Sequence, residues 1–349
     1  MIEQHTPAML TLHLTNGDAA AAGLARSGLP GDILSWRDVL HDGPVLPEPD
    51  LDVFRRARAE FLASRGWLPE PAALLDLTER DERLAGVTAT DEIVLWFEPN
   101  LCDQLQLVQV VARLARRPPS QRPLLTIAPV DHFLGPLVPE KFAPIFALRR
   151  AMQEEDLDHA TGVWSAFSSP TPEAVTDVVH RLDREVRART YAADDSVRVP
   201  HLAAALRRQL EEYPDIDHGL SRTERQICEV LEPGVITLEK LFVASQATES
   251  WAWLSDWSFA WYLQRLSDCS HPLIVHPNGS RILAPQRDAS GRGFWERAAQ
   301  LTPFGAEVLR GREDVIAANG IDRFMGGVRN TSGRCWRWDA RLQQVMVRG

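Results

Sequence analysis

The sequence predicts an α/β domain with a Rossmann-like, mostly parallel sheet of about four or more strands, followed by an α-rich segment and a winged-helix-like domain. Two observations carry this prediction. Short apolar runs alternate with longer helical patterns in residues 1–150, as in strands joined by crossover helices. After residue 213 the pattern changes to three helices and a hairpin. We therefore expect three parts: residues 1–150, a helical connecting segment at 151–218, and residues 219–349 with a tail rich in arginine and tryptophan.

Four apolar runs predict the strands of the first part. They cover residues 10–15, 32–36, 92–97 and 124–128. The first and third runs are each followed by a helical pattern, at residues 19–27 and 101–116. A sheet with covering helices accounts for this alternation.

The last part begins with a helix start signal. Ser221 and Glu224 match a capping box, in which each side chain bonds the other residue's backbone N–H, so a helix begins at residue 221. The other elements expected here are helices at 237–245 and 253–266 and a hairpin of residues 272–276 and 281–283. Three helices and a hairpin resemble a winged helix.

Polar and ionisable side chains follow every predicted strand of the first part. Ligands of open α/β sheets bind outside the carboxyl ends of the strands, where loops and helix N-termini converge. The side chains at these ends are Asn16, Asp18, Arg37, Asp38, His41, Asp42, Glu98, Asn100, Asp103, Gln104, Asp131 and His132. We therefore predict a polar ligand site at this edge of the sheet.

His41 is the predicted proton-transfer group, because it lies between Asp38 and Asp42 in one loop. Either aspartate would orient His41 or hold a cation, and Glu98 completes the predicted catalytic set. The predicted ligand-binding residues are Asn16, Asp18, Arg37, Asn100, Asp103 and Gln104, with Asp322 and Arg323 as a cap over the cleft. The predicted function is binding of a small polar or phosphorylated metabolite, with acid–base or metal-assisted chemistry.

Several of these residues also have a structural explanation. Asp18 suits a helix N-cap, and Asp103 lies in a first helical turn, where the helix dipole favours an acid. Asp42 can simply begin a turn, and Arg37 and Asp38 can pair with each other or brace the loop. The prediction of a site therefore rests on the convergence of these side chains.

Because crowded carboxylates can bind a cation, a divalent metal such as Mg²⁺ is a possible cofactor. A dinucleotide is not expected, because the sequence has neither the G-x-G-x-x-G fingerprint after the first strand nor a Walker A motif. The motifs of lipases, zincins and zinc deaminases are also missing from it. An enzyme is favoured over a pure binding protein, and the reaction class, hydrolase, lyase or transferase, stays open.

The alternative function is that of a ligand-responsive winged-helix transcriptional regulator. Helix 253–266, at the recognition position, has one arginine and large apolar side chains on every face, whereas groove-reading helices expose polar and basic side chains. The tail, residues 323–349, has six arginines and two tryptophans, a composition that suits stacking and phosphate contacts. We expect helix 253–266 to pack against the N-terminal domain or a second subunit. Nucleic acid is therefore a less favoured partner, and a homo-oligomer formed through the C-terminal part is possible.

Several longer motifs resemble a known family. They are LHLTNGD (12–18), LPG (29–31), WRDVLHDGP (36–44), WFE (96–98) with DQLQL (103–107), GLSRTERQ (219–226), and NGIDR (319–323) with GG (326–327). Over most of the chain these motifs closely resemble bacterial proteins classed as domain of unknown function 1835. The resemblance implies that the N-terminal α/β module and the C-terminal helical module occur together, and it assigns no activity.

The composition is that of a globular protein, with 44% hydrophobic and 25% charged residues, which excludes disorder, collagen and coiled coil for the chain as a whole. The four cysteines lie far apart without a C-x-x-C pair, so neither a zinc module nor a disulfide framework is predicted. No apolar run approaches the roughly 18 residues that cross a bilayer, and the start lacks the features of a signal peptide. We expect a cytoplasmic protein with no membrane partner.

Overall fold

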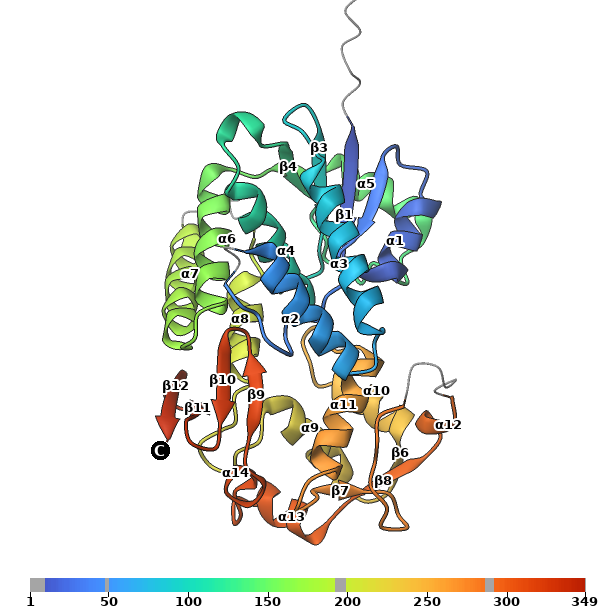
Figure 1. The fold of residues 1–349 in the computed structure, drawn as a ribbon, viewed down its shortest axis with the longest axis vertical. Helices are drawn as coiled ribbons and strands as arrows, with labels where there is room; N and C mark the ends of the chain where they lie inside the picture. The colour runs from blue at the N-terminus through green and yellow to red at the C-terminus, as the bar shows by residue number, and fades with distance from the viewer. Residues whose placement is uncertain (1–9, 48–49, 192–198, 286–291, 349) are drawn as a thin grey trace, which may run out of the picture. The chain divides into compact units, whose positions relative to one another are not determined.

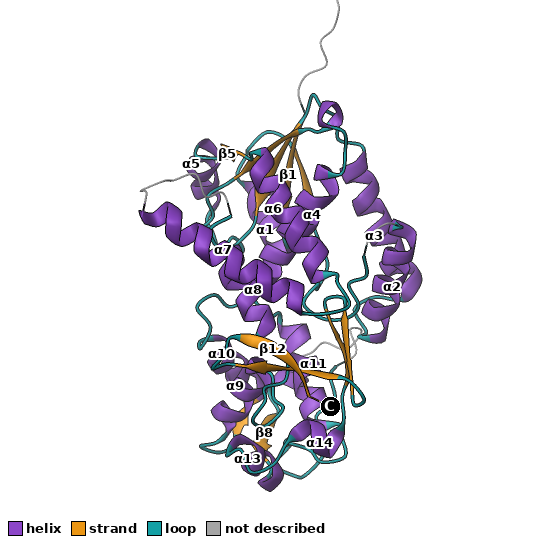
Figure 2. Cartoon of the chain, turned by 90° about the vertical axis from the view of Figure 1, so that its left-hand side faces the viewer, coloured by secondary structure: helices purple, strands orange, loops and turns teal. Residues whose placement is uncertain are grey.

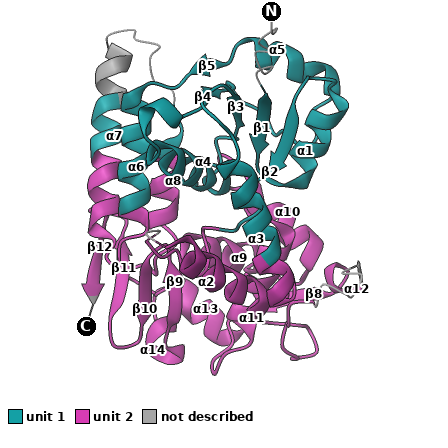
Figure 3. Cartoon of the chain, turned by 45° about the horizontal axis from the view of Figure 1, so that its top comes forward, with its two compact units in different colours: residues 1–39, 75–165, 181–203 teal, residues 40–74, 166–180, 204–349 magenta. Residues whose placement is uncertain are grey.

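The computed structural model describes residues 10–47, 50–191, 199–285 and 292–348 (Figure 1). These residues form a mixed α/β structure in which helices predominate and the strands form four sheets (Figure 2). The chain divides into two compact units (Figure 3). Unit 1 contains Met1–Val39, Leu75–Ser165 and Arg181–Ala203, and unit 2 contains Leu40–Leu74, Ala166–His180 and Ala204–Gly349.

The sheet of unit 1 has five strands in the order β2-β1-β3-β4-β5. They are β1 (Thr11–Thr15), β2 (Asp32–Ser35), β3 (Glu92–Trp96), β4 (Leu124–Ile127) and β5 (Arg150–Ala151). The first four are parallel and β5 is antiparallel to β4. The four predicted strands and the mostly parallel sheet are thereby confirmed, with strand ends within one residue of those expected.

Side chains of β3 pack on both faces of the sheet, because β3 is central and every one of its residues is buried. Val94 and Trp96 lie against α1 (Gly17–Arg26) and α5 (Phe142–Ala147), in a core cluster that includes Leu24 and Phe142. Ile93 and Leu95 alternate to the opposite face. Hydrophobic side chains thus hold the sheet in the core of unit 1, and polar residues follow the carboxyl ends of its strands.

The other helices of unit 1 include α4 (Leu101–Ala115), which follows β3 and is buried along most of its length. Four helices contribute residues to both units: α3 (Glu70–Ala85), α6 (Glu154–Phe167), α7 (Glu173–Tyr191) and α8 (Leu202–Leu210). The boundaries between the units therefore fall within helices.

Unit 2 contains seven further helices among the described residues. They are α2 (Leu51–Ser64), α9 (Arg222–Leu231), α10 (Leu238–Gln246), α11 (Asp256–Ser267), α12 (Arg292–Trp295), α13 (Pro303–Leu309) and α14 (Val315–Asn319). The predicted capping box is present at α9: Glu224 N donates to Ser221 Oγ at 3.3 Å, and Ser221 N donates to Glu224 Oε2 at 2.8 Å. This confirms the helix start predicted at residue 221.

The strands of unit 2 form a three-stranded sheet and two hairpins. The sheet has the order β6-β8-β7, from β6 (Ile236–Thr237), β7 (Ile274–Val275) and β8 (Ala298–Leu301). The hairpins pair β9 (Asp322–Met325) with β10 (Val328–Thr331), and β11 (Cys335–Asp339) with β12 (Gln344–Arg348).

The hairpin predicted between residues 272–276 and 281–283 is wrong. The turn is present, since Gly279 N donates to the carbonyl of His276, but β7 pairs with β8. The backbone N–H of Ile282 donates instead to Ser267 Oγ at 2.8 Å, and that of Ala284 to Gln264 Oε1 at 2.8 Å. Polar side chains of α11 therefore take the hydrogen bonds that a hairpin would need.

None of the helices described is both long enough and apolar enough to cross a membrane.

Candidate functional site

Asp103 is the centre of a hydrogen-bond network at the carboxyl edge of the sheet of unit 1. It lies in the first turn of α4, whose N-cap is Asn100. Asn16, which follows β1, donates from Nδ2 to Asp103 Oδ1 at 2.6 Å. Glu98, which follows β3, donates from its backbone N to Asp103 Oδ2 at 2.8 Å, and Asp103 N donates to Asn100 Oδ1 at 3.0 Å. The adjacent ends of β1 and β3 therefore meet the start of α4 at one carboxylate.

The carboxylate of Glu98 is held in the same network. Asn100 Nδ2 donates to Glu98 Oε2 at 2.9 Å, and Leu134 N donates to Glu98 Oε1 at 2.6 Å. The backbone carbonyl of Glu98 accepts from Gln104 Nε2 at 2.8 Å. Five predicted site residues are therefore brought together: Asn16, Glu98, Asn100, Asp103 and Gln104.

Burial and, to a smaller extent, the nearby charge of Glu98 raise the pKa of Asp103 to about 7, although the hydrogen bonds from Glu98 N and Asn16 oppose this shift. Burial also raises the pKa of Glu98, against the bonds from Leu134 and Asn100. Two interacting carboxyl groups release their protons in two steps, and the pKa values of these steps belong to the pair as a whole. The pair can therefore hold one proton near neutral pH.

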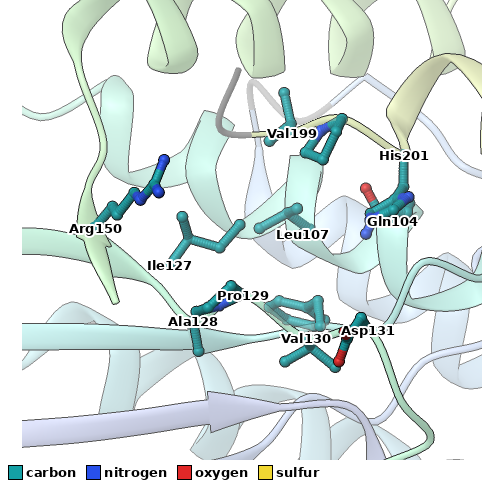
Figure 4. Close-up of a pocket in the computed structure, with 12 residues that line it drawn as sticks. Gln104, Leu107, Ile127, Ala128, Pro129, Val130, Asp131, Arg150, Val199 and His201 are labelled. Atoms are coloured by element: carbon teal, nitrogen blue, oxygen red, sulfur yellow. The ribbon is translucent and has the colours of Figure 1, made fainter. Parts of the chain in front are cut away.

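A cavity of about 260 Å³ lies beside this network, at the carboxyl end of β4 (Figure 4). Its wall is largely apolar, with Phe97, Leu107, Ile127, Val130 and Val199. Its polar side chains are Gln104, Asp131, Arg150 and His201. Binding pockets for small molecules combine such an apolar wall with a few polar groups that orient the ligand.

Gln104 is a buried polar side chain of the cavity, and within the described part of the chain its amide nitrogen is bonded and its amide oxygen is free to bind a ligand. The residue is only 3% exposed, and its Nε2 is used in the bond to Glu98. Its Oε1 is buried and has no hydrogen-bond partner among the described residues. Because an unsatisfied buried acceptor costs roughly 1–3 kcal/mol, a ligand N–H or O–H at this point would be stabilised.

His201 lies next to Gln104 in the cavity wall, while Arg150 lies at the opposite side (Figure 4). Burial lowers the pKa of His201, and Asp131 raises it by less. The imidazole is therefore neutral near pH 7 and can accept a proton. Arg150 supplies a positive charge for an anionic group of a ligand.

Arg150 and His201 were missed by the sequence reasoning. Arg150 lies in the two-residue strand β5, and His201 lies far along the chain, just before α8. Asp131 lies in the loop that leaves β4, so its place at the strand exit was predicted. No local pattern marks Arg150 or His201, because tertiary packing alone places them at the cavity.

Of the remaining predicted residues of unit 1, Arg37 and Asp18 lie outside this network. Asp38 is joined to it only through its backbone carbonyl, because Gln106 Nε2 donates to that carbonyl and also to Asn16 Oδ1 at 3.1 Å. Arg37 pairs with Asp18 at 2.7 Å and with the half-buried Asp76 at 2.9 Å, so the expected pairing of Arg37 with Asp38 is not formed. Asp18 makes no N-cap bond, because the N-cap position of α1 is Asn16. Asp38 is buried, and its carbonyl accepts from Gln106 Nε2 at 2.7 Å.

His41 and Asp42 belong to unit 2. The His41 ring lies edge-on to Trp253, with ring centroids 4.8 Å apart. Burial would raise the pKa of Asp42, but the charges of Arg65, Arg265 and His41 together lower it by more. Asp42 is thus an ionised carboxylate, and its carbonyl accepts from a buried arginine of α2.

Asp322 and Arg323 also belong to unit 2, and both have partners there. Arg329 Nε donates to Asp322 Oδ1 at 2.8 Å, and Arg323 Nη1 donates to Glu224 Oε1 at 3.0 Å. No group of three or more His, Cys, Asp or Glu side chains in the described part of the chain is placed to hold a metal ion.

No family model and no curated protein sequence matches the chain. Among solved structures, it is similar to the crystal structure of the Plasmodium falciparum topoisomerase II DNA-binding, cleavage and re-ligation domain, with 11% sequence identity and a TM-score of 0.41. The match covers 95% of this chain and 55% of that one, so the chain spans about half the length of that structure. A likeness this distant carries no argument about function.

Proposed function

We propose that the protein binds a small polar or phosphorylated metabolite in the cavity beside Gln104, and that it is an enzyme acting on this ligand by acid–base or metal-assisted chemistry. The observation that carries the proposal is the buried Gln104 Oε1, which has no hydrogen-bond partner among the described residues. The surrounding side chains support it, because Arg150 suits an anionic group and the apolar wall suits a carbon skeleton.

Acid–base chemistry is supported by two features of unit 1. His201 is a base at the cavity wall, and the Glu98–Asp103 pair is bonded to Gln104 through the Glu98 carbonyl. In this proposal His201 takes a proton from the ligand, while the carboxyl pair positions Gln104 and supplies a second titratable group. The roles given above to Asp38, His41 and Asp42, and to a divalent metal such as Mg²⁺, stay predictions, as does the reaction class.

Gln104→Leu and Gln109→Leu form a matched pair for testing this proposal. Both glutamines are buried on α4, but Gln109 accepts from Trp36 Nε1 at 2.9 Å and does not line the cavity. The measurement is thermal unfolding against metals, nucleotides, sugar phosphates and amino acids. A ligand at 100 times its Kd adds about 2.7 kcal/mol to the stability of the folded state.

We expect one ligand class to raise the Tm of the wild type and of Gln109→Leu, and to leave the Tm of Gln104→Leu unchanged. Gln109→Leu should itself be less stable by about 1–3 kcal/mol, because it strands the Trp36 N–H. If Gln104→Leu responds as the wild type does, or if no class shifts the wild type, this cavity is not the ligand site.

The alternative proposal is a ligand-responsive regulator with a winged-helix-like module in unit 2. Its support is the succession α9, β6, α10, α11, β7, β8 together with the antiparallel sheet order β6-β8-β7. Against DNA reading, Trp257 and Trp261 of α11 both donate from Nε1 to the carbonyl of Arg65. The alternative requires duplex affinity that falls with salt and is lost in Arg334→Ala, whose side chain is exposed. Arg337, the second tail arginine expected to contact DNA, is buried and donates to Asp314, so Arg337→Ala would test the fold instead.

Membership of the family called domain of unknown function 1835 also stays a proposal, supported by the sequence motifs alone.

A further inference from the structure

A second cavity, of about 460 Å³, lies wholly within unit 2 and has no role in the function proposed above. It is bounded by the start of α9, the end of α11, α14 and β9. Its charged side chains are Glu224, Arg265, Asp268, Asp322 and Arg323. Asn319 and Ser332 also line it.

Two arginines of this cavity share one carboxylate. Arg265 Nε donates to Glu224 Oε1 at 2.8 Å, and Arg323 Nη1 donates to the same oxygen at 3.0 Å. The other oxygen of Glu224 accepts from Ser221 N in the capping box at 2.8 Å. One oxygen of Glu224 is therefore shared by two guanidinium groups, and Arg323 Nη2 donates in addition to the backbone carbonyl of Glu212 at 2.8 Å.

Each arginine also keeps a buried nitrogen atom without a hydrogen-bond partner among the described residues. These atoms are Arg265 Nη2 and Arg323 Nε. Burial lowers the pKa of Arg265, but Glu224, Tyr262 and Asp42 raise it by more, so the side chain stays charged. Charged donors left unpaired in a cavity cost more than neutral ones, and guanidinium groups match carboxylate and phosphate oxygens in geometry.

The acids of the lining limit the charge of a ligand. Asp322 is taken up by Arg329, whose Nε and Nη2 donate to its two oxygens at 2.8 Å each. Asp268, the residue that follows α11, is exposed and adds one negative charge at the wall. One oxyanion group therefore suits the cavity better than a polyanion.

We propose that this cavity binds a small metabolite through a single oxyanion group, a carboxylate or a phosphate, held between Arg265 and Arg323. The site is separate from the cavity beside Gln104, so either proposal can fail while the other stands.

Cys269 offers a readout that needs no variant, because its half-buried thiol lines the same cavity. The experiment follows alkylation of Cys269 in the full-length wild type by iodoacetamide, with peptide mass spectrometry, in acetate or inorganic phosphate and in chloride at equal ionic strength. We expect the oxyanion to slow alkylation about tenfold or more at saturation, as occupancy approaches completion. Protection by acetate alone identifies a carboxylate site, and protection by phosphate alone identifies a phosphate site.

Variants test the two arginines. Arg265→Gln and Arg323→Gln should lose the protection, whereas Arg310→Gln, which removes an exposed arginine paired with Glu307, should keep it. Asp268→Asn removes a surface charge that opposes the ligand, so it should tighten binding about two- to fivefold. Gln104→Leu should leave all of these responses unchanged.

The proposal is overturned if neither anion slows alkylation of Cys269 in the wild type. It is also overturned if folded Arg265→Gln and Arg323→Gln respond as the wild type does, or if Asp268→Asn weakens binding.

Discussion

Asp103 links the ionisation of the candidate site to the stability of the fold. Burial and the charge of Glu98 raise its pKa from 3.8 to about 7 in the folded chain. Between these two values the folded state binds the proton more tightly than the unfolded state. The stability that this carboxyl group contributes is therefore fully present below pH 3.8 and is lost as the pH rises through about 7.

Asp103→Asn removes this titration and keeps the side-chain shape. We expect the variant to gain stability relative to the wild type between pH 5 and pH 8, by about 1–4 kcal/mol, because only the wild type pays for ionising a buried carboxyl group. Urea unfolding at both pH values measures the difference. Glu98→Gln is the control, since removing the neighbouring charge should shrink the wild-type pH dependence. A constant difference between Asp103→Asn and the wild type would contradict the shifted pKa.

The sequence alone could predict the residues of this network, because they sit next to elements with strong patterns. Asn16 and Glu98 follow the apolar runs of β1 and β3, and Asn100 precedes the long amphipathic pattern of α4. The sequence could not show that Arg37 turns to Asp18 and Asp76, or that His201 reaches the cavity. Those placements depend on side-chain packing between segments far apart in the chain.

The turn of the β9–β10 hairpin lies close to the backbone at the end of α6. This turn is formed by Gly326 and Gly327, and Gly327 N donates to the carbonyl of Phe167 at 2.9 Å. A Cβ atom at residue 327 would overlap the carbonyl group of Ser168. The turn can therefore lie against the end of α6 only if residue 327 lacks a side chain.

Gly327→Ala should destabilise the protein by about 1–3 kcal/mol, because two backbone segments would have to move apart. Gly333→Ala is the matched control: this glycine lies in the next turn, has open space around it and has no positive φ. We expect Gly333→Ala to change the free energy of unfolding by less than about 0.5 kcal/mol. Equal losses for the two variants in a denaturant titration would show that the close approach is unimportant.

The sequence predicted the longer strands correctly but not the shortest elements. Long runs predicted β1 to β4, but β5 has two residues and no pattern, so it was missed. Residues 281–283 have the composition of a strand, yet side chains of α11 take their backbone hydrogen bonds. Pairing between short strands is decided by such long-range partners.

The two units are interleaved along the chain. Their boundaries fall at residues 39/40, 74/75, 165/166, 180/181 and 203/204, and four of these lie inside α3, α6, α7 and α8. Unfolding one unit therefore removes part of a helix from the other. Chains of this length usually unfold domain by domain, but shared helices couple the two transitions.

We expect calorimetry to show one unfolding transition, with the calorimetric enthalpy equal to the van't Hoff enthalpy. Gly327→Ala, although it perturbs only unit 2, should lower the midpoint of that whole transition. Two resolved peaks, or a shift of only part of the heat absorption, would mean that the units unfold independently.

Both edge strands of the five-stranded sheet are short. At one edge β5 pairs through only two exposed residues, and at the other β2 has four residues and begins with the exposed Asp32. Long, flat edges offer unpaired backbone groups to another chain and promote aggregation, whereas short, charged edges do not. The sheet is thus a poor template for the addition of a strand from a second copy of this protein.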